Sequence, residues 1–546
     1  MNLIKNPILK GFNPDPSILK VGEDFYIATS TFEWYPGVQI HHSKDLKNWR
    51  LLTRPLKRKS QLDMMGEGYS LGVWAPCLSY DNGTFYLVYT DAKESGNAYN
   101  YLVTTNDIER DWSEPIYLHS RGFDPSLFHD QDGKKWLVAA WWDNIPWNMS
   151  INRNCELKDA VYNKRIKEQY KKYDKKWELF KGIILQEYDD KQKKLIGDSY
   201  KIFDKSIGIT EGPHLYKKNG FYYLITAEGG TSYGHAVTMA RSKNITGNYE
   251  IHPENPILTA KDKDCNLQKA GHADLVELDN GEVYMVHLCS RPIKKFSGSV
   301  LGRETAIQKM KWCEDGWLRM ECGGNTPQTE IIAPALPQKK WENLPARDDF
   351  DSKNLRLDYQ WLRGDIFDEI ASLTERSGFL RLKGKEMVLS KYKQSLIARR
   401  QQSFEYTATT ALEFFPDDEN QMAGLIVYYC EQLFYYLYIG YDEKIGRFLS
   451  IMTNDMGDIN LFHAERVEIK DTKRIYLRAE VRYENLEFYY SADEKNWQKI
   501  GDKLDMTLIS DEHSFGFTGS FVGICCQDPQ TMRNYADFNF FEYIED

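Results

Sequence analysis

The sequence has no long apolar segment, no regular cysteine spacing and no excess of positive charge. Among its 546 residues, no run approaches the roughly 20 apolar residues that a bilayer span needs. The first residues, MNLIKNPILKGFNPDPS, lack the apolar run of a signal peptide. The nine cysteines show no CxxC spacing, which favours reduced thiols over a disulfide framework and gives no zinc site. We therefore expect a cytoplasmic protein that binds no membrane.

The charge balance excludes another class of partner. The 70 basic and 80 acidic residues give a net charge of −10, which argues against a nucleic-acid binder whose affinity comes from phosphate neutralisation. Aromatic residues, in contrast, are abundant at 14%. They suit pleated strands, and their flat faces also suit stacking on sugar rings. Composition leaves both interpretations open, and we expect an uncharged partner.

One unit of sequence recurs five times. Each copy has a short first motif, an apolar strand, a turn at Asp, Asn or Gly, and a second strand rich in aromatic residues. The copies are DPSILKVGEDFYIATS, APCLSYDNGTFYLVYT, DPSLFHDQDGKKWLVAAWW, EGPHLYKKNGFYYLITAEG and HADLVELDNGEVYMVHLCS. Turn pairs such as Asn82-Gly83, Asn219-Gly220 and Asn280-Gly281 favour hairpins because Asn and Gly accept positive φ. Each unit is therefore predicted to begin with a β-hairpin.

Most units continue into two further strand-like segments, which gives about four strands per unit. Five such units predict a five-bladed β-propeller over residues 1–325, an architecture that limits exposed sheet edges by radial repetition. A two-sheet sandwich is the alternative. The interval after the third copy is long because a Lys-rich segment, around residues 152–180, interrupts the strand pattern. We interpret it as an inserted surface element.

The chain changes character after the last repeat. The segment IIAPALPQKKWENLPARDDF contains three prolines and no strand periodicity, so residues 326–345 are predicted to be a linker. Beyond it, strand and turn patterns alternate to the end, which predicts a β-sandwich over residues 346–546. The predicted fold class is therefore all-β, a five-bladed β-propeller followed by a β-sandwich domain.

In a propeller, the first residues of the repeats lie on the innermost strands and converge at one end of the central channel. The five start positions are Asp15, Ala75, Asp124, Glu211 and His272. Proline after Asp15 and Asp124 holds these two residues stiffly in extended geometry. For each acid singly, a turn-forming role is the alternative. Three acids in register predict a shared site.

Three carboxyl groups in one small space predict acid–base chemistry. Like charges held together raise one another's pKa, so such a site favours one ionised and one protonated carboxyl at neutral pH. Glycosidic bond cleavage needs that combination. Arg303 is expected nearby as a partner for a carboxylate, with the aromatic side chains of Phe32 and Trp74. A surface ion pair and plain packing are the alternatives for these three, and for His272 the alternative is a buried core histidine.

These residues lie in motifs that are identifiable as an ordered set. NPDPSILKVGEDFYIATSTFEWYPGVQIHHSKDLKNW is followed by GVWAPCLSY, GFDPSLF, TEGPHLY, AEGGTSYGHAVTMARS, GHADLV and GRET. The set strongly resembles the glycoside hydrolase family 43 β-xylosidases, and the later TGSFVGICCQD resembles their C-terminal β-sandwich. The resemblance implies a five-bladed propeller enzyme that inverts the anomeric carbon. The Lys-rich segment departs from the family pattern.

The resemblance also implies roles for individual residues. Asp15 would be the general base, Glu211 the general acid, and Asp124 the acid that orients Glu211 and raises its pKa. The substrate-binding positions would be Phe32, Trp74, Thr231, His272, Arg303 and Phe521. Phe521 would be an aromatic side chain that the sandwich contributes to close the pocket, and filling of the sandwich core is its alternative role. No cofactor is required by this scheme; calcium held through water near His272 is an alternative that the resemblance leaves open.

The expected activity is exo-acting release of xylose from the non-reducing end of β-1,4-xylo-oligosaccharides, with side activity on α-L-arabinofuranosides. The alternatives are an α-L-arabinofuranosidase on the same scaffold, a fructan-type hydrolase with retaining chemistry, and a carbohydrate-binding propeller without catalysis. The three acids argue against the last, because a binding pocket does not need three stiffly held carboxylates. The sequence leaves open whether the chain forms a homo-oligomer.

Overall fold

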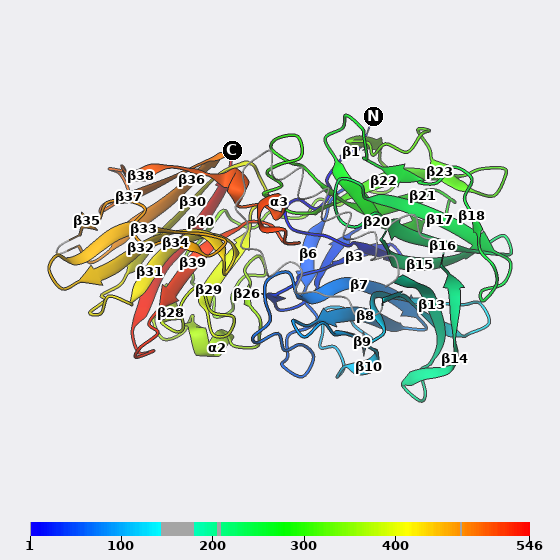
Figure 1. Ribbon diagram of the computed structural model, residues 1–546, viewed down its shortest axis with the longest axis horizontal. Coiled ribbons are helices and arrows are strands. Elements are labelled where there is room, and N and C mark those ends of the chain that lie inside the picture. Colours follow the sequence, from blue (N-terminus) through cyan, green and yellow to red (C-terminus); the bar gives the residue numbers. More distant parts are fainter. Residues whose placement is uncertain (1, 143–179, 205–208, 470–471) are drawn as a thin grey trace.

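The computed structural model describes residues 2–142, 180–204, 209–469 and 472–546 (Figure 1). The Lys-rich segment lies almost entirely outside these residues, so its interpretation as a surface insertion stays a prediction. Across the described ranges, the chain forms two neighbouring bodies that consist mainly of strands (Figure 1). No helix in these ranges is long and apolar enough to cross a membrane.

Five antiparallel sheets form the first body. The first two contain β2 (Ser17–Val21), β3 (Asp24–Thr29), β5 (Gln39–Ser43) and β6 (Arg50–Thr53), then β7 (Gly72–Asp81), β8 (Thr84–Ala92), β9 (Ala98–Thr105) and β10 (Ile116–His119). The third contains β11 (Gly122–His129), β12 (Lys135–Trp142), β13 (Phe180–Asp189) and β14 (Lys194–Phe203). The fourth contains β15 (Thr210–Lys218), β16 (Phe221–Glu228), β17 (Ala236–Ser242), β18 (Glu250–Ile251) and β19 (Leu258–Thr259). The fifth contains β20 (Gln268–Glu277), β21 (Val283–Ser290), β22 (Glu304–Trp312) and β23 (Leu318–Met320).

The first strands of the five sheets close a ring. Strands β2, β7, β11, β15 and β20 contact one another in this order, and β20 contacts β2. The architecture is therefore the predicted five-bladed β-propeller (Figure 1). Two of the predicted Asn-Gly turns, at Asn82-Gly83 and Asn219-Gly220, have positive φ at both residues and join strands that pair directly. In the third, only Gly281 has positive φ, because the loop there is longer.

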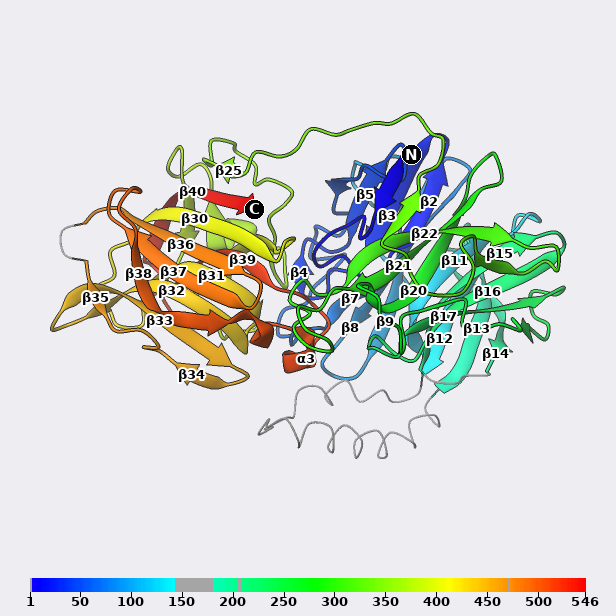
Figure 2. The same ribbon diagram turned by 90° about the horizontal axis from the view of Figure 1, so that it is seen from above.

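The N-terminal strand and the segment after the fifth blade are paired. Strand β1 (Leu3–Lys5) forms an antiparallel ladder with β24 (Glu330–Ile332), which lies within the predicted linker. The connection between the two bodies is therefore shorter than predicted. It crosses the first blade, where Lys339 N donates to Asp45 Oδ2 (2.9 Å) and Trp341 Nε1 donates to Asn48 O (3.1 Å). Figure 2 shows this segment as the green loop along the top of the view.

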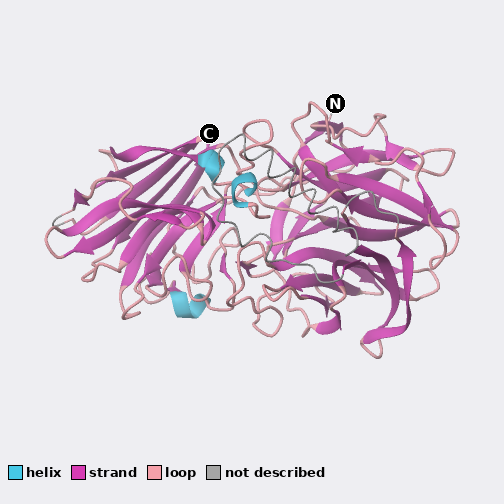
Figure 3. Ribbon diagram, in the orientation of Figure 1, coloured by secondary structure: helices cyan, strands magenta, loops and turns pink. Residues whose placement is uncertain are grey.

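Two antiparallel sheets form the second body, the predicted sandwich (Figure 3). One contains β27 (Ala371–Ser372), β28 (Leu380–Lys383), β40 (Tyr535–Glu545), β30 (Glu405–Glu413), β36 (Ile475–Arg482), β37 (Asn485–Ser491) and β38 (Gln498–Asp505), with β25 (Arg347–Asp348) beside β40. The other contains β29 (Ser395–Arg400), β39 (Phe521–Gln527), β31 (Met422–Cys430), β32 (Leu433–Asp442), β33 (Gly446–Asp455) and β34 (Asp458–Asn460), with β35 (Val467–Glu468) beside β33. The helical turns described are α2 (Phe367–Ile370), η3 (Met506–Leu508) and α3 (Asp511–Ser514).

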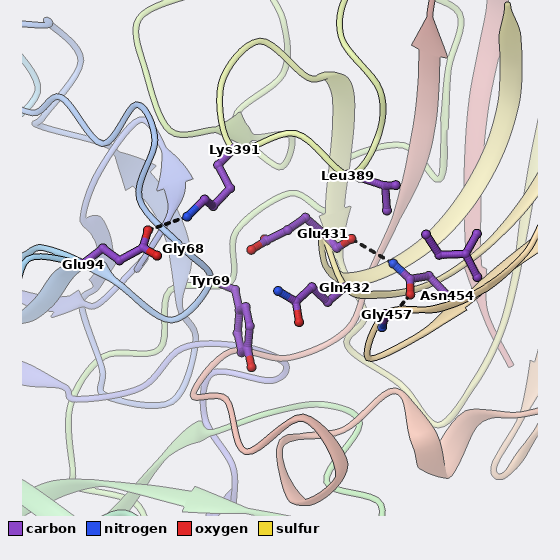
Figure 4. Close-up of a pocket in the computed structure, with 10 residues that line it drawn as sticks. Gly68, Tyr69, Glu94, Leu389, Lys391, Glu431, Gln432, Asn454 and Gly457 are labelled. Atoms are coloured by element: carbon purple, nitrogen blue, oxygen red, sulfur yellow. Dashed lines mark hydrogen bonds and ion pairs between the residues drawn. The ribbon is translucent and has the colours of Figure 1, made fainter. Parts of the chain in front are cut away.

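The two domains share backbone pairing and a common apolar cluster. Strand β26 (Trp361–Leu362), at the edge of the sandwich domain, pairs with β4 (Trp34–Tyr35) of the propeller. Buried aromatic residues of both domains form one cluster, which includes Phe12, Trp34, Tyr428 and Phe521. A cavity of about 330 Å³ also lies between the domains, and beside it Lys391 of the sandwich domain contacts Glu94 of the propeller (Figure 4). The domains are therefore packed together as one unit.

Candidate active site

The start positions of the blades share an unusual backbone conformation. Asp15, Ala75, Asp124 and His272 all have positive φ, between 36° and 55°, so the extended geometry predicted for Asp15 and Asp124 is wrong. This left-handed region costs a residue with a side chain about 1–2 kcal/mol, and such strain tends to gather at functional sites. In the fourth blade the equivalent conformation, with φ of 56°, belongs to Gly212 and not to Glu211.

The alignment of Glu211 with the other start residues was therefore wrong by one residue. A bulge in β15 lies between Glu211 and His214, and the proline that follows the start position in this blade is Pro213. Glu211 is thus equivalent to Trp74 in the second blade, the residue before the start position. Alternate positions of an extended chain point in different directions, so Glu211 approaches the site differently from the two aspartates.

Asp15 is the ionised member of the three acids. Its carboxylate accepts hydrogen bonds from Ser30 Oγ (2.6 Å) and Arg303 Nη1 (3.0 Å), and the residue is 5% exposed. Burial opposes ionisation, but the charge of Arg303 and the Ser30 hydrogen bond outweigh it, so the pKa of Asp15 is lowered. Asp15 therefore carries a negative charge at neutral pH.

Asp124 and Glu211 share the opposite tendency. Burial, followed by the charges of Glu211 and Asp15, raises the pKa of Asp124 well above its usual value. Burial, followed by the charge of Asp15, raises the pKa of Glu211 to about 8. The Asp124 carboxyl accepts a hydrogen bond from Gly212 N (3.0 Å), the residue next to Glu211. The structure thus brings the three acids into one site, where Glu211 is partly exposed and protonated at neutral pH.

Two neutral histidines complete the buried wall of this site. His272 Nδ1 lies 3.9 Å from Asp15 Oδ1, and burial lowers the pKa of His272 to about 4. A Cβ atom on Gly212 would lie 3.0 Å from the His272 ring, so this close approach favours glycine. His235, which sequence reasoning missed, is fully buried beside Gly271, and its Nδ1 lies 3.1 Å from Lys269 O.

The calcium alternative at His272 receives no support from the geometry. Within the described ranges, no group of three or more His, Cys, Asp or Glu side chains is arranged to hold a metal ion. His272 offers one imidazole, and the neighbouring Asp15 carboxylate is already bonded to Arg303 and Ser30.

Arg303 connects the acids to the second domain. Besides Asp15, its guanidinium donates to the backbone O of Phe517 through Nη2 (2.9 Å) and Nε (3.3 Å). The same group lies 5.2 Å from the ring centre of Phe32 and 5.6 Å from that of Phe517. Phe517 also lies near Trp74, with ring centres 6.4 Å apart. Three predicted residues, Phe32, Trp74 and Arg303, therefore meet at the acids, together with a loop of the sandwich.

The prediction that Phe521 closes the pocket was wrong in position. Phe521 is fully buried on β39, where its ring stacks on Trp34 with centres 3.6 Å apart and an angle of 11° between the planes. It fills the core between the domains and cannot meet a substrate. The sandwich side chain that reaches the site is Phe517, four residues earlier in SFGFTGSF. The aromatic-among-small-residues pattern that selected Phe521 fits Phe517 equally well.

Ser70 joins the two aromatic walls of the site and was also missed. Its Oγ accepts a hydrogen bond from Phe517 N (2.8 Å), and its backbone O accepts one from Trp74 Nε1 (3.1 Å). Its own N–H donates to Glu33 Oε2 (3.0 Å), and its φ is 63°. Thr231 lies half-buried in the loop between β16 and β17, and its role in substrate binding stays a prediction.

Comparison with known proteins decides the family. The family described as glycosyl hydrolases family 43 matches residues 4–318, and the beta xylosidase C-terminal Concanavalin A-like domain matches residues 347–544. The chain belongs to glycoside hydrolase family 43. It is therefore an enzyme that hydrolyses glycosidic bonds, and the non-catalytic alternative is set aside.

Relatives of this family 43 chain match over its whole length. Xylosidase/arabinosidase 43B of Humicola insolens is 46% identical over 561 residues, with 100% of this chain and 98% of the relative covered. A beta-xylosidase of Bacillus subtilis (strain 168) is 45% identical, with 99% of each chain covered. The crystal structure of a xylan beta-1,4-xylosidase from Bacillus halodurans C-125 superposes with a TM-score of 0.91 at 47% identity, covering 99% of this chain and 100% of that one.

Proposed function

We propose that this family 43 hydrolase releases xylose from the non-reducing end of β-1,4-xylo-oligosaccharides with inversion of the anomeric carbon, and that it also cleaves α-L-arabinofuranosides. The observation that carries the proposal is the pairing of an ionised Asp15 with a protonated, partly exposed Glu211 in one site. The named activities of the similar proteins from Humicola insolens, Bacillus subtilis and Bacillus halodurans support the substrate class.

In the proposed mechanism, the Asp15 carboxylate accepts a proton from a water molecule as that water attacks the anomeric carbon. Glu211 donates its proton to the departing glycosidic oxygen, so the bond from carbon to that oxygen breaks as the bond to water oxygen forms. Inversion requires room for the water, with the two carboxyl groups roughly 6.5–9.5 Å apart. Asp124 holds the backbone beside Glu211 through Gly212 N, while burial and the charge of Asp15 favour the protonated form of Glu211.

The exo-acting mode follows from the contribution of the second domain. Phe517 meets Phe32, Trp74 and Arg303 from the sandwich side. We infer that these side chains surround one terminal sugar and leave no passage for a polymer beyond it. Stacking of sugar faces on aromatic rings would then hold the terminal residue, while Arg303 keeps Asp15 ionised.

The second candidate is an α-L-arabinofuranosidase, because a xylopyranose and an arabinofuranose can present similar faces to one site. The name of the Humicola insolens relative, which includes both activities, favours keeping this candidate. The ratio of the two activities decides between them.

Purified protein tests the proposal on nitrophenyl β-D-xylopyranoside and nitrophenyl α-L-arabinofuranoside, with kcat/KM measured for each. Proton NMR should show α-xylose as the first anomer formed from the β-xyloside, because inversion changes the configuration. β-1,4-Xylobiose should be split, β-1,3-xylobiose serves as the linkage control, and long xylan should lose only terminal xylose. First formation of β-xylose, or internal cleavage of xylan, would contradict the mechanism or the exo mode, respectively.

Cytoplasmic location is part of the same proposal. All eight cysteines in the described ranges are free, and four of them, Cys289, Cys430, Cys525 and Cys526, are at most 1% exposed, which suits a reducing compartment. The enzyme would then act on short oligosaccharides after their uptake. Fractionation of expressing cells, with activity assayed in each compartment, tests the location.

A further inference from the structure

Two arginines between the domains are buried without a carboxylate partner. Arg54, just after β6 of the propeller, is 5% exposed, and Arg400, at the end of β29 of the sandwich, is 6% exposed. Arg54 donates to Tyr359 O (3.1 Å) and to Gln39 Oε1 (2.8 Å). Arg400 donates to Phe12 O (2.6 Å) and to Gln360 Oε1. Every one of these acceptors is neutral.

The two guanidinium groups lie within electrostatic range of each other, since burial and the charge of Arg54 lower the pKa of Arg400. Their partners Tyr359 and Gln360 are consecutive in the chain, and each arginine contacts one of them. The rings of Phe12 and Phe521 lie 5.6 Å and 5.1 Å from the Arg400 guanidinium carbon. These aromatic neighbours cover the guanidinium and restrict the access of solvent to it.

Each arginine also keeps an unused donor. Arg54 Nε and Arg400 Nη2 are buried and have no hydrogen-bond partner among the described residues. The carboxylate that acts on Arg54 through space is Asp358, but its Oδ2 already accepts from Arg356 (2.7 Å) and Arg399 (3.2 Å). Positive charge at this interface therefore exceeds the negative charge that the protein supplies.

This surplus cannot be removed by loss of a proton. A guanidinium stays charged in proteins, and an uncompensated buried charge costs several kcal/mol. The neighbouring His41 is affected by the same positive charges. Burial and the charges of Arg400 and Arg54 lower the pKa of His41 to about 3. A buried arginine elsewhere in the same interface shows the ordinary solution: Arg363 is paired with Glu431 Oε2 at 2.7 Å.

We propose that Arg54 and Arg400 together hold a small monovalent anion, such as chloride, between the propeller and the sandwich. The anion accepts hydrogen bonds from the two unused donors, Arg54 Nε and Arg400 Nη2, and supplies the missing negative charge. Because one ligand comes from each domain, bound anion favours the docked arrangement of the two domains. Binding to the folded state alone raises stability in proportion to the logarithm of anion concentration above Kd.

The first test is the thermal unfolding temperature of the full chain in sodium chloride and in sodium gluconate at equal ionic strength. Chloride should raise the temperature by about 2 °C or more, and the rise should grow with the logarithm of chloride concentration; gluconate, a much larger anion, should not raise it. Sodium bromide should act like chloride. Equal curves in chloride and gluconate would count against the proposal.

Three variants test whether the chloride-specific rise in unfolding temperature arises at Arg54 and Arg400. Arg54→Gln and Arg400→Gln each remove one positive charge and keep an amide donor, so the chloride-specific rise should disappear in both. Arg363→Gln is the matched control: it also removes a buried interfacial arginine, but one with a carboxylate partner, so it should lower stability while the chloride-specific rise persists. A chloride rise of wild-type size in Arg54→Gln and Arg400→Gln would overturn the proposal.

Crystals of the unaltered protein grown in sodium bromide without chloride provide a direct test, even if a variant fails to fold. An anomalous difference peak within hydrogen-bond distance of Arg54 Nε and Arg400 Nη2 would support the proposal. Density without anomalous signal there would mean water only and would overturn it. Bromide found only on the surface would identify an adventitious ion only, with the same consequence.

Discussion

Buried charge is balanced in opposite ways at the mouth of the propeller channel and at the interface between the domains. At the channel mouth, the charge of one guanidinium, that of Arg303, acts on three acids, Asp15, Asp124 and Glu211, and forms an ion pair with Asp15, so acid groups are in surplus. At the interface, Arg54 and Arg400 have only neutral acceptors among the described residues. Asp15 and Asp124 are buried to the same degree as Arg54 and Arg400.

The comparison shows that the sign of an excess buried charge decides how that charge can be neutralised. A surplus carboxyl group takes up a proton, and the raised pKa of Glu211 is the direct result. An excess guanidinium cannot be neutralised in this way, because it keeps its proton in proteins. An acid surplus thus provides a proton for chemistry, whereas a basic surplus creates a requirement for an ion.

Replacement of the acids should produce the largest effect. Asp15→Asn and Glu211→Gln should each lower kcat at least about a hundredfold, the usual contribution of a general acid or base. Their stabilities should differ in sign. Asp15→Asn leaves Arg303 without its carboxylate and should unfold at a lower temperature. Glu211→Gln should unfold at a higher temperature, because the amide is neutral in the folded site without having to bind a proton. Calorimetry and steady-state kinetics measure the two quantities.

The stability gain of Glu211→Gln should depend on pH in a defined way. The folded pKa of Glu211 is raised to about 8, so the wild type loses stability as pH rises from the ordinary Glu range to about 8. The gain should therefore grow over that window. Asp130→Asn is the control, because Asp130 is paired with Lys217 and Tyr222 away from the site and its loss should leave kcat near the wild-type value. A large fall in kcat for Asp130→Asn would show that general damage explains the results.

Substitution of Phe521 should mainly lower stability, whereas substitution of Phe517 should mainly weaken substrate binding. Phe521→Ala should cost about 3–5 kcal/mol in the free energy of unfolding, since it empties a fully buried site stacked on Trp34. Phe517→Ala should cost less stability and raise KM more, because Phe517 lies half-buried at the acids. Urea denaturation and kinetics with nitrophenyl xyloside test the pair; the reverse pattern would return the pocket-closing role to Phe521.

Removal of the positive charge of Arg303 should shift the pH profile. Wild-type activity should fall at low pH as Asp15 gains a proton and at high pH, near 8, as Glu211 loses one. Arg303 lowers the pKa of both groups. In Arg303→Gln both limbs of the kcat/KM profile should therefore move to higher pH, in addition to any loss of rate. If both limbs stay in place, Arg303 binds substrate without setting the charge of the acids.

Ser70 should give the smallest effect. Ser70→Ala and Ser70→Gly both remove the acceptor of Phe517 N, a bond worth about 1 kcal/mol, so KM should rise about fivefold in each. At a φ of 63°, the glycine variant should be more stable than the alanine variant by about 1 kcal/mol. A purely structural role would make KM follow stability, so that Ser70→Ala shows the higher KM.

Repetition made the propeller and two of its acids predictable. The Asp-Pro pairs at Asp15 and Asp124 lie at equivalent positions of successive hairpins, and alternation within each hairpin is a local property of the chain. Glu211 was also selected, but it was aligned with the wrong position. Equivalent bulges begin at Trp74 and Phe123 in the second and third blades, so Gly212, not Glu211, is the counterpart of Asp124. The following Pro213 was the signal that could have corrected the alignment.

Contacts between the domains were much less predictable. Ser70 and His235 carry no local pattern that distinguishes a site residue from an ordinary turn or core residue, and the local pattern at Phe517 fits Phe521 equally well. Phe517 meets Ser70 across 447 positions of sequence, and Arg400 meets Phe12 across 388. Such contacts depend on how the two folded domains dock, and the hydrophobic periodicity of the sequence does not encode this docking.

The two-residue ladder between β26 and β4 has a consequence for the history of the chain. Its hydrogen bonds run through backbone at Trp361–Leu362 and Trp34–Tyr35, so they survive changes of side chain but not a change in the path of either segment. A propeller of this kind recombined with an unrelated sandwich would lose that ladder together with Phe517 and its partners. We therefore expect the two halves to be inherited as one gene segment, and successful chimeras to exchange both halves together.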